Sequence, residues 1–300
     1  MRVFVTGATG FIGTAVVKEL ASAGHQVLGL CRSEEKAAAL RAAGAGIHRG
    51  SLEDESSLAD GAAKTDGVIH LAFNHDFSTY VGNCEDDRRV IATLGAVLKG
   101  SKRPLIVTSG TAIARAAPGQ PSREDDPAVG SDVSPRAASE EAAAALVKEG
   151  VNASVVRLPQ VHDTTRQGFV SLAIQVYLQK GACGYLGEGL NRWPAAHVLD
   201  TARLYRLALE KAEPNAKYHA VGEEGVKIRD IAQTLGRRLK LPVKSIAPEN
   251  AGEFFGFLGM FAALDMPASS AETQKKLNWK PAGPSMLADL ENLALPGVAA

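Results

Sequence analysis

The stretch VFVTGATGFIG at residues 3–13 combines a short apolar run with three glycines in the spacing GxxGxxG. We expect a strand over Arg2–Thr6, a tight turn that contains Gly7, Gly10 and Gly13, and a helix that follows at once. Glycine permits such a turn and lets the backbone approach a pyrophosphate, whose charge is favoured at a helix N-terminus. The stretch therefore predicts a dinucleotide site rather than only a tight turn.

Further apolar runs alternate with amphipathic segments through the first half of the chain. We expect strands at Gln26–Cys31, Gly67–Ala72, Leu105–Thr108 and Ser154–Leu158, with helices between them. Apolar strands separated by helices are typical of a parallel sheet covered on both faces, so the sequence predicts a doubly wound α/β fold of the Rossmann type. Ligands bind beyond the carboxyl ends of such strands, and the residues that follow them should face one crevice.

The pattern changes about halfway along the chain, where longer helices and glycine-rich or proline-rich loops begin. We expect a dinucleotide-binding domain over residues 1–160 and a smaller, mainly helical substrate region over residues 161–300. The second region includes predicted helices at Phe169–Lys180 and Asp200–Lys211. A strand near Tyr218–Val221 would return to the first sheet.

The composition indicates a partner of small size. The 300 residues hold 33 basic and 33 acidic side chains, so no net charge attracts nucleic acid or an anionic membrane. The three cysteines lie far apart, outside any zinc-ligand spacing, and predict neither a disulfide framework nor a metal site. With no apolar run of about 18 residues and no leader before the first strand, we expect a cytoplasmic protein.

The segment TGATGFIG (6–13) resembles the fingerprint of the short-chain dehydrogenase/reductase superfamily, in its extended and atypical branches related to nucleotide-sugar epimerases and 3β-hydroxysteroid dehydrogenases. The resemblance continues in order through most of the chain. The further segments are similar to the family's GDL, HLA, RPxxV and HVxD motifs: GSL (50–52), HLA (70–72), RLPQV (157–161) and HVLD (197–200). Ser51 departs from the usual aspartate, which weakens one adenine contact. Monomer and homodimer both remain open.

The end of the second expected strand decides between NAD and NADP. An acidic residue there would bind the ribose 2′-hydroxyl of NAD and repel a 2′-phosphate, but this chain has Arg32 and Ser33 instead. The planar fork of arginine binds phosphate well, which favours NADP(H) over NAD(H). Alternatively, Arg32 is a solvated residue at a helix start and NAD binds without the acid. Together with the resemblance, this implies cofactor contacts from Gly7, Thr9, Gly10, Phe11, Ile12, Gly13, Arg32, Ser33, Ser51, Leu52, Leu71, Ala72, Phe73, Thr108, Ser109, Pro159 and Val161.

The catalytic residues that the resemblance implies are missing. The family carries a tyrosine and, four residues later, a lysine on one helix, with a serine after the fifth strand, yet no YxxxK occurs in the 300 residues. Alignment at Ser134-Pro135 puts Arg136 at the tyrosine and Glu140 at the lysine, and Gly110 stands where the serine is expected. Arginine cannot supply the proton because its pKa exceeds about 12. Arg136 could bind an anionic group, or form an i,i+4 ion pair with Glu140.

Other polar groups near the strand ends are candidates for catalysis. His75, beyond the fourth strand, is our first choice of proton donor because imidazole titrates near neutrality; the alternative is a surface-loop histidine. Ser109 and Thr111 could hydrogen-bond a substrate carbonyl and its developing oxyanion, or only cap the strand end. His162 could approach the nicotinamide or be structural, and we expect His197 to be structural.

Residues 252–261 form an apolar run broken by glycines, with four of the nine phenylalanines: Phe254, Phe255, Phe257 and Phe261. The run either lines an apolar pocket suited to an aromatic or steroid-like carbonyl compound, or is ordinary core or dimer surface.

Two functions remain open. The chain is either an NADP(H)-dependent oxidoreductase that acts on a small apolar carbonyl, imine or enone substrate with a non-standard proton donor, or a catalytically inactive dinucleotide-binding sensor. An epimerase or dehydratase acting on a nucleotide sugar would need the tyrosine and lysine, so we rank it last.

Overall fold

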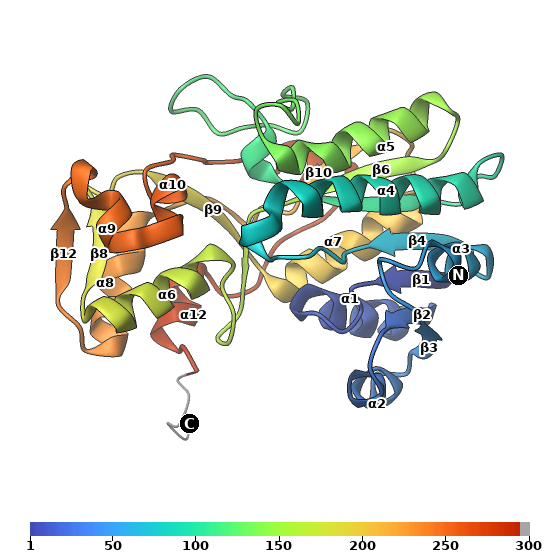
Figure 1. Cartoon of the computed structure of the whole chain (residues 1–300), viewed down its shortest axis with the longest axis horizontal. Coiled ribbons are helices and arrows are strands. Elements are labelled where there is room, and N and C mark those ends of the chain that lie inside the picture. Colours follow the sequence, from blue (N-terminus) through green and yellow to red (C-terminus); the bar gives the residue numbers. More distant parts are fainter. Residues whose placement is uncertain (295–300) are drawn as a thin grey trace.

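The computed structural model describes residues 1–294, which form a larger and a smaller lobe (Figure 1). A seven-stranded sheet with the order β10-β6-β5-β4-β1-β2-β3 forms the centre of the larger lobe, and every neighbouring pair in it is parallel. Its strands are β1 (Arg2–Thr6), β2 (Gln26–Cys31), β3 (Gly46–Arg49), β4 (Gly67–His70), β5 (Leu105–Gly110), β6 (Ala153–Leu158) and β10 (Lys217–His219). The Rossmann-type α/β fold predicted from the sequence is confirmed.

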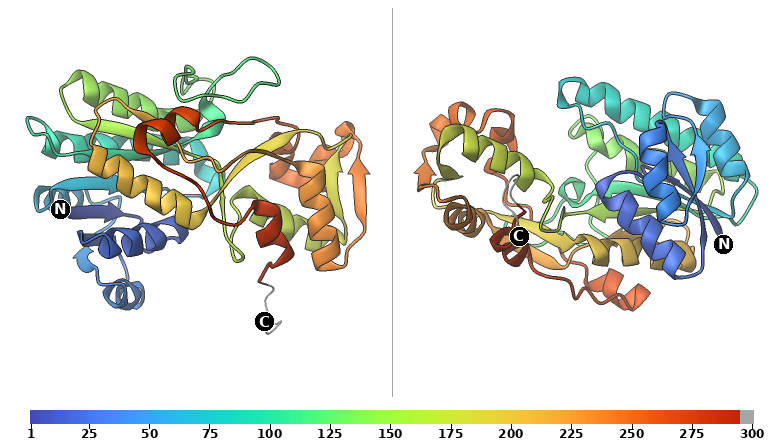
Figure 2. Two further views of the ribbon diagram at one scale, coloured as in Figure 1. Left: turned by 180° about the vertical axis from the view of Figure 1, so that it is seen from behind. Right: turned by 90° about the horizontal axis from the view of Figure 1, so that it is seen from below.

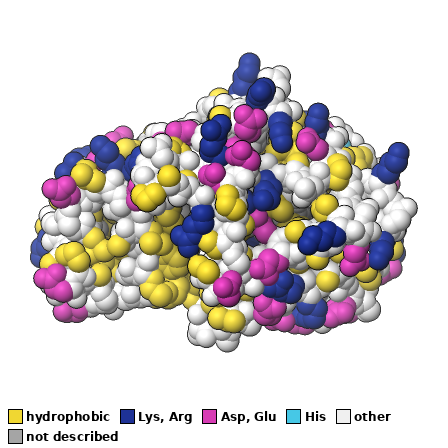
Figure 3. Space-filling model, turned by 90° about the horizontal axis from the view of Figure 1, so that it is seen from above, with side chains coloured by type: hydrophobic (Ala, Val, Ile, Leu, Met, Phe, Trp, Pro, Cys, Tyr) yellow, Lys and Arg dark blue, Asp and Glu magenta, His cyan; other side chains and the backbone are white. Residues whose placement is uncertain are grey.

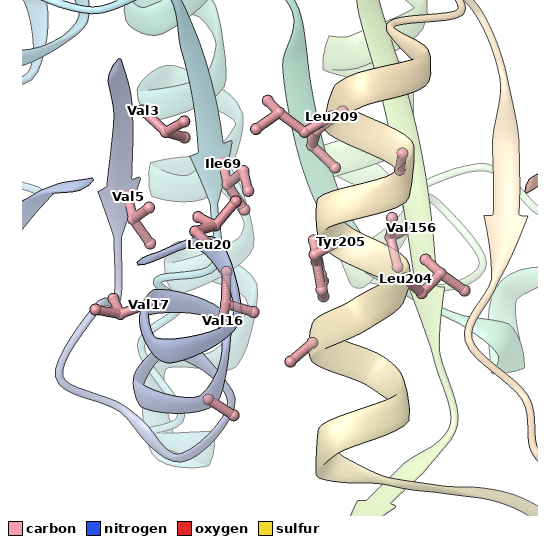
Figure 4. Close-up of a cluster of buried hydrophobic side chains, with 14 of the residues drawn as sticks. Val3, Val5, Val16, Val17, Leu20, Ile69, Val156, Leu204, Tyr205 and Leu209 are labelled. Carbon is pink, nitrogen blue, oxygen red and sulfur yellow. The ribbon is translucent and has the colours of Figure 1, made fainter. Parts of the chain in front are cut away.

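Helices cover both faces of this sheet. Two separate clusters of buried apolar side chains fill the spaces between helices and strands, one on each face. The first face is covered by α1 (Phe11–Ser22), α2 (Glu34–Ala42) and α7 (Val198–Lys211); the second by α3 (Glu55–Ala63), α4 (Tyr80–Leu98) and α5 (Ala138–Lys148). Figure 4 shows Tyr205 and Leu209 of α7 in the first cluster, with Ile69 of β4 and Leu20 of α1.

The smaller lobe has its own apolar core between a three-stranded sheet, β11-β9-β7, and a two-stranded sheet, β12-β8. Figure 2 shows this lobe beside the larger one from two further directions. Its elements are β7 (Gln160–His162), α6 (Phe169–Lys180), β8 (Cys183–Leu186), β9 (Arg192–His197), β11 (Glu223–Lys227), α8 (Ile228–Leu239), β12 (Val243–Ile246), α9 (Ala251–Phe255), α10 (Gly259–Ala262) and α12 (Met286–Glu291). Another helix, α11 (Ala271–Leu277), returns to the larger lobe beside β10.

Several strand ends are shifted from the expected bounds, and the smaller lobe, expected to be mainly helical, contains five short strands that were not predicted: β7, β8, β9, β11 and β12. β4 stops at His70, two residues early, and β5 continues to Gly110. The short strand β3 was missed because its four residues, GIHR, carry little apolar character. The helix expected over Asp200–Lys211 is α7, but it packs on the first sheet rather than in a substrate region, since its apolar stripe faces β4, β5 and α1.

Charged side chains of both signs are distributed over the surface of the protein. Figure 3 shows acidic and basic side chains interspersed over one face, in keeping with a formal net charge of zero. Among residues 1–294, no helix has the length and apolar character needed to span a membrane. The same residues contain no group of three or more side chains placed to ligate a metal, and Cys31, Cys84 and Cys183 are buried free thiols.

The packing of α7 on the first sheet gives a matched test on one helix. Leu209 is fully buried, so Leu209→Ala should lower the free energy of unfolding by about 2–5 kcal/mol through lost burial and a cavity. Leu199 lies on the same helix and is 62% exposed, so it serves as the control. Leu199→Ala should change the free energy of unfolding by less than about 0.5 kcal/mol. Urea denaturation measures both, and equal effects would show that α7 does not pack on the sheet as described.

Candidate active site

The turn after β1 requires glycine at two positions. Gly7 has a φ of +67°, and a Cβ there would lie 2.7 Å from the backbone nitrogen of Ala72. A Cβ on Gly13 would lie 2.0 Å from the carbonyl oxygen of Gly7. Gly10 is exposed at the N-cap of α1, whose first turn carries no acidic residue. A helix start with free N–H groups and no acidic side chain suits a pyrophosphate, so the residues present fit a bound dinucleotide.

A chain of buried hydrogen bonds begins at the end of the same strand. The Thr6 hydroxyl accepts from the backbone N–H groups of Leu71 and Ala72, at 3.2 and 3.3 Å, and is 2.7 Å from Nδ1 of His70. Nε2 of His70 lies 2.9 Å from Oδ1 of Asp87 on α4. All three polar side chains are at most 3% exposed. The ends of β1 and β4 are thus tied to α4.

The residues expected beside the adenosine ribose follow β2 and β3. Arg32 is exposed, and the Ser33 hydroxyl caps α2 by accepting from the backbone N–H of Lys36 at 3.4 Å. A hydrogen bond from Ser51 and, to a smaller extent, the charge of Arg32 lower the pKa of Glu53. Arg32 therefore presents an exposed cation at this edge of the crevice, with one carboxylate nearby.

Arg136 lies at the carboxyl ends of β4 and β5. Its Nη1 donates to Oδ2 of Asp87 at 2.9 Å and also to the Ser139 hydroxyl, and its Nη2 donates to the carbonyl oxygen of Thr108 at 2.9 Å. The guanidinium carbon lies 4.2 Å above the ring of Phe73. Burial alone would raise the pKa of Asp87, but His70 and Arg136 favour its charged form and lower the pKa to about 2.

Glu140 has a different partner, so of the two alternatives for Arg136 the i,i+4 ion pair with Glu140 is wrong. Glu140 accepts two hydrogen bonds from Arg157, from Nε at 2.7 Å and Nη2 at 2.9 Å. Arg157 is fully buried and also lies 3.2 Å from Nε2 of His219. The carboxylate turns toward β6 because an unpaired guanidinium there would be costly. Glu140 thus neutralises a buried charge in the core of the larger lobe.

His75 lies in the loop between β4 and α4, as the sequence predicts. Its ring is exposed and meets Phe73 edge-on, with 5.1 Å between ring centroids. The protein on one side still removes water from the ring, and this desolvation, with a smaller contribution from the charge of Arg136, lowers the pKa of His75. The structure therefore brings His75, Phe73 and Arg136 together at one end of the sheet.

The hydroxyls that follow β5 are buried. The Ser109 Oγ is enclosed and has no hydrogen-bond partner in the described chain, whereas the Thr111 Oγ1 lies 3.4 Å from the carbonyl oxygen of Leu158. At Gly110, where the family has its serine, a Cβ would meet only the carbonyl oxygen of Leu158, at 3.9 Å. Its φ of −127° suits any residue. A side chain at Gly110 would therefore meet no steric obstacle, and the position lies on β5, the strand whose Thr108 carbonyl oxygen accepts from Arg136.

His162 is fully buried in the smaller lobe. Its Nδ1 lies 2.7 Å from Oδ2 of Asp289 on α12, and its ring faces His197 at 5.8 Å. Burial, the largest effect, lowers the pKa of His162. No hydrogen bond of His162 reaches His75, Ser109 or Thr111 within the described residues. His162 joins the small sheet to α12, and His197 belongs to the same cluster.

Aromatic rings bridge the two lobes. Phe77, which follows His75, lies 4.6 Å from Phe257 and 6.3 Å from Phe169 of α6, measured between ring centroids. Phe169 lies 4.8 Å from Phe261. The phenylalanine-rich run is therefore divided: Phe257 contacts the loop after β4, Phe261 packs on Phe169 and Phe257, and Phe255 belongs to the core of the smaller lobe.

Three residues that sequence reasoning missed contribute to this site. Asp87 holds Arg136, and its sequence signal is weak: Asn83 and Asp87 lie one helical turn apart on the buried face of α4. Phe77 has no signal beyond its aromatic character. Tyr80 begins α4 beside Phe73, and burial raises its pKa to about 12, so its phenol stays protonated at neutral pH.

Comparison with known proteins adds a family and a fold. Residues 3–221 match the NAD dependent epimerase/dehydratase family. An uncharacterized protein of Schizosaccharomyces pombe is 47% identical over 97% of this chain and 98% of its own, and one of Saccharomyces cerevisiae is 43% identical over 97% and 98%. The structure resembles dTDP-glucose 4,6-dehydratase of Streptomyces venezuelae, solved with NAD, with a TM-score of 0.77, 18% identity and coverage of 97% and 95%.

The buried pair of Glu140 and Arg157 generates a stability prediction. Glu140→Gln should lower the free energy of unfolding by about 3–5 kcal/mol, because it leaves the buried guanidinium without its counter-charge. The control is the neighbouring Glu141, 40% exposed and paired with Arg88, where Glu141→Gln should cost less than about 1 kcal/mol. Denaturant titration measures the free energy of unfolding of each variant. If both substitutions lowered it by a similarly small amount, Glu140 would not be part of a buried ion pair.

Proposed function

The chain belongs to the NAD-dependent epimerase/dehydratase family, and from that premise we propose that it is an NADP(H)-dependent oxidoreductase. It transfers a hydride to or from a small apolar carbonyl, imine or enone compound. The observation that carries the proposal is the glycine turn, in which Gly7 and Gly13 leave no room for a Cβ and set the start of α1 against the crevice. When bound, the nicotinamide supplies the hydride.

The preference for NADP(H) rests on the end of β2. Neither of the two residues that directly follow this strand, Arg32 and Ser33, is acidic, and Arg32 presents an exposed guanidinium where a 2′-phosphate would lie. Glu53 also attracts Arg32, but a phosphate carries more charge than one carboxylate and forms stronger paired hydrogen bonds. The dehydratase structure of Streptomyces venezuelae contains NAD rather than NADP. The preference for NADP(H) that we expect therefore rests on this chain's own residues and not on that structural neighbour.

The residues at the carboxyl ends of the strands suit hydride transfer with a proton donor outside the usual tyrosine. His75 stands in the loop after β4 beside Phe73 and within the field of Arg136. We assign it the proton that the substrate oxygen or nitrogen takes up, because a protonated imidazole with a lowered pKa is a strong enough acid to release it. The Ser109 hydroxyl, buried and without a partner in residues 1–294, is a second polar group at the end of β5.

The aromatic bridge supports an apolar substrate. Phe77, Phe169, Phe257 and Phe261 approach one another between the lobes, and Phe257 remains 40% exposed. Rings of this kind offer apolar contact area and edge or face geometry to a flat ligand. We further expect the protein to act in the cytoplasm on small molecules, as a monomer or homodimer.

A catalytically inactive dinucleotide-binding sensor is the second candidate. The observation that favours it is that Arg136 and Glu140, at the positions of the family's tyrosine and lysine, are both held in ion pairs within the protein. A sensor would bind NADPH and change its affinity for a protein partner without turnover. Measurable turnover of any substrate would exclude it.

The cofactor preference gives a direct binding test. Arg32→Ala should weaken NADPH binding about 10- to 100-fold and leave NADH binding unchanged, because only NADPH carries the 2′-phosphate that the guanidinium would pair with. Arg41→Ala is the control, since Arg41 lies on α2 and pairs with Glu34. Titration of nucleotide fluorescence measures all affinities. Equal loss for both nucleotides, or none for NADPH, would remove Arg32 from the cofactor site.

Turnover and its pH dependence test the function itself. Highly pure protein should oxidise NADPH steadily with at least one member of a panel of aromatic and aliphatic carbonyls, imines and enones. Reduction needs protonated His75, so kcat/KM should fall as the pH rises through a value below about 6.5, the ordinary pKa of histidine. In the oxidation direction it should rise over the same range.

The matched variant is His75→Gln, which should lower kcat by about 10²- to 10⁴-fold and abolish the inflection. An unchanged pH profile in this variant would assign the proton to another donor. No turnover across the panel would reject the oxidoreductase and leave the sensor.

A further inference from the structure

Arg136 lies beside the carboxyl ends of β4 and β5. Its Nη2 donates to the carbonyl oxygen of Thr108, near the end of β5, and its guanidinium stacks on Phe73, three residues beyond the end of β4. Gly110, where a Cβ would have only one neighbour within 4 Å, lies two residues further along β5 from Thr108. The guanidinium therefore stands between two strand ends that, in a parallel sheet of this kind, face the ligand.

The position of Arg136 is fixed by buried partners. Asp87 accepts from Nη1 at 2.9 Å, and its other oxygen lies 2.9 Å from His70, which in turn contacts Thr6. These three residues are at most 3% exposed, so the carboxylate cannot turn to solvent. Phe73 holds the face of the guanidinium. A cation held in this way needs little reorganisation when charge develops next to it.

Arg136 also has donors to spare. A guanidinium carries five N–H bonds, and Asp87, Ser139 and Thr108 take three of them. The other two have no partner among residues 1–294. The side chain is 16% exposed, so it is not sealed in the core.

We propose that Arg136 binds the oxygen of the substrate carbonyl and stabilises the negative charge that forms on it. This inference rests on the proposed function. The carbonyl carbon, or the β-carbon of an enone, accepts the hydride from the reduced nicotinamide with its electron pair. The π electrons move to the oxygen, which becomes an oxyanion held by the spare N–H groups of Arg136. A proton from His75 or water then completes the alcohol or enol, and the oxidised nicotinamide remains.

The proposal makes the site a receptor for oxyanions, which a binding experiment can detect without turnover. Benzoate carries an anionic oxygen on an aromatic ring, and benzamide is its neutral analogue of the same shape. Protein saturated with NADP⁺ should bind benzoate at least about 10-fold more tightly than benzamide, measured by isothermal calorimetry.

Three variants isolate the guanidinium. Arg136→Met combined with Asp87→Asn removes both charges together, which avoids an unpaired buried carboxylate. It should abolish the preference for benzoate and lower kcat for carbonyl reduction about 10²- to 10³-fold. Arg136→Lys keeps the positive charge but loses the planar guanidinium. It should retain part of the preference for benzoate and part of the kcat for carbonyl reduction. Arg88→Met is the control, because Arg88 pairs with Glu85 and Glu141 outside the crevice, and should change neither.

The outcomes separate this inference from the proposed function. Turnover that is unchanged in the double variant, or wild-type protein without a preference for benzoate, overturns the role of Arg136 while the oxidoreductase stands. An Arg136-dependent preference for benzoate in a protein that turns over no substrate supports the oxyanion site and rejects the oxidoreductase. NADP⁺ binding by each variant confirms that the cofactor site has folded.

Discussion

The turn after β1 packs so closely against the end of β4 and the start of α1 that Gly7 and Gly13 cannot carry a side chain. A Cβ on Gly7 would lie 2.7 Å from the backbone of Ala72, and one on Gly13 would lie 2.0 Å from that of Gly7. This close approach sets the start of α1 over the strand ends and brings the Thr6 hydroxyl to the backbone of residues 71 and 72. From the same junction the hydrogen bonds continue through His70 and Asp87. The constraint at Gly7 and Gly13 thus positions both the start of α1, where we propose that the dinucleotide binds, and the hydrogen-bonded residues that hold Arg136.

Arg136 and Glu140, the residues that align with the family's tyrosine and lysine, have separate charged partners. Glu140 turns inward and forms a buried ion pair with Arg157, so it is committed to the core. Arg136 instead stays at the crevice, held by Asp87 and stacked on Phe73. The proposed chemistry follows from this division: stabilisation of the oxygen is separated from delivery of the proton, two roles that a single tyrosine can combine.

The features that could be predicted from the sequence are those that depend on neighbouring residues along the chain. Continuous apolar strands and the glycine spacing were sufficient for the Rossmann-type sheet, and the strand bounds of β1 and β2 were predicted correctly. The missed features depend on distant partners: Asp87 and Arg136 are 49 residues apart, and an amphipathic helix such as α7 does not reveal which sheet its stripe will meet. The sequence also does not show which of two arginines pairs with Glu140. In the structure Glu140 pairs with the buried Arg157 and not with Arg136, one helical turn away.

Transfer of deuterium from NADPH that carries two deuterium atoms at C4 of the nicotinamide tests the central claim most directly. If the glycine turn holds a working cofactor, mass spectrometry of the product from a carbonyl or enone compound should show a gain of one deuterium at the reduced carbon. Tight binding of the labelled NADPH without deuterium in any product would contradict the claim and leave a dinucleotide-binding protein without hydride chemistry.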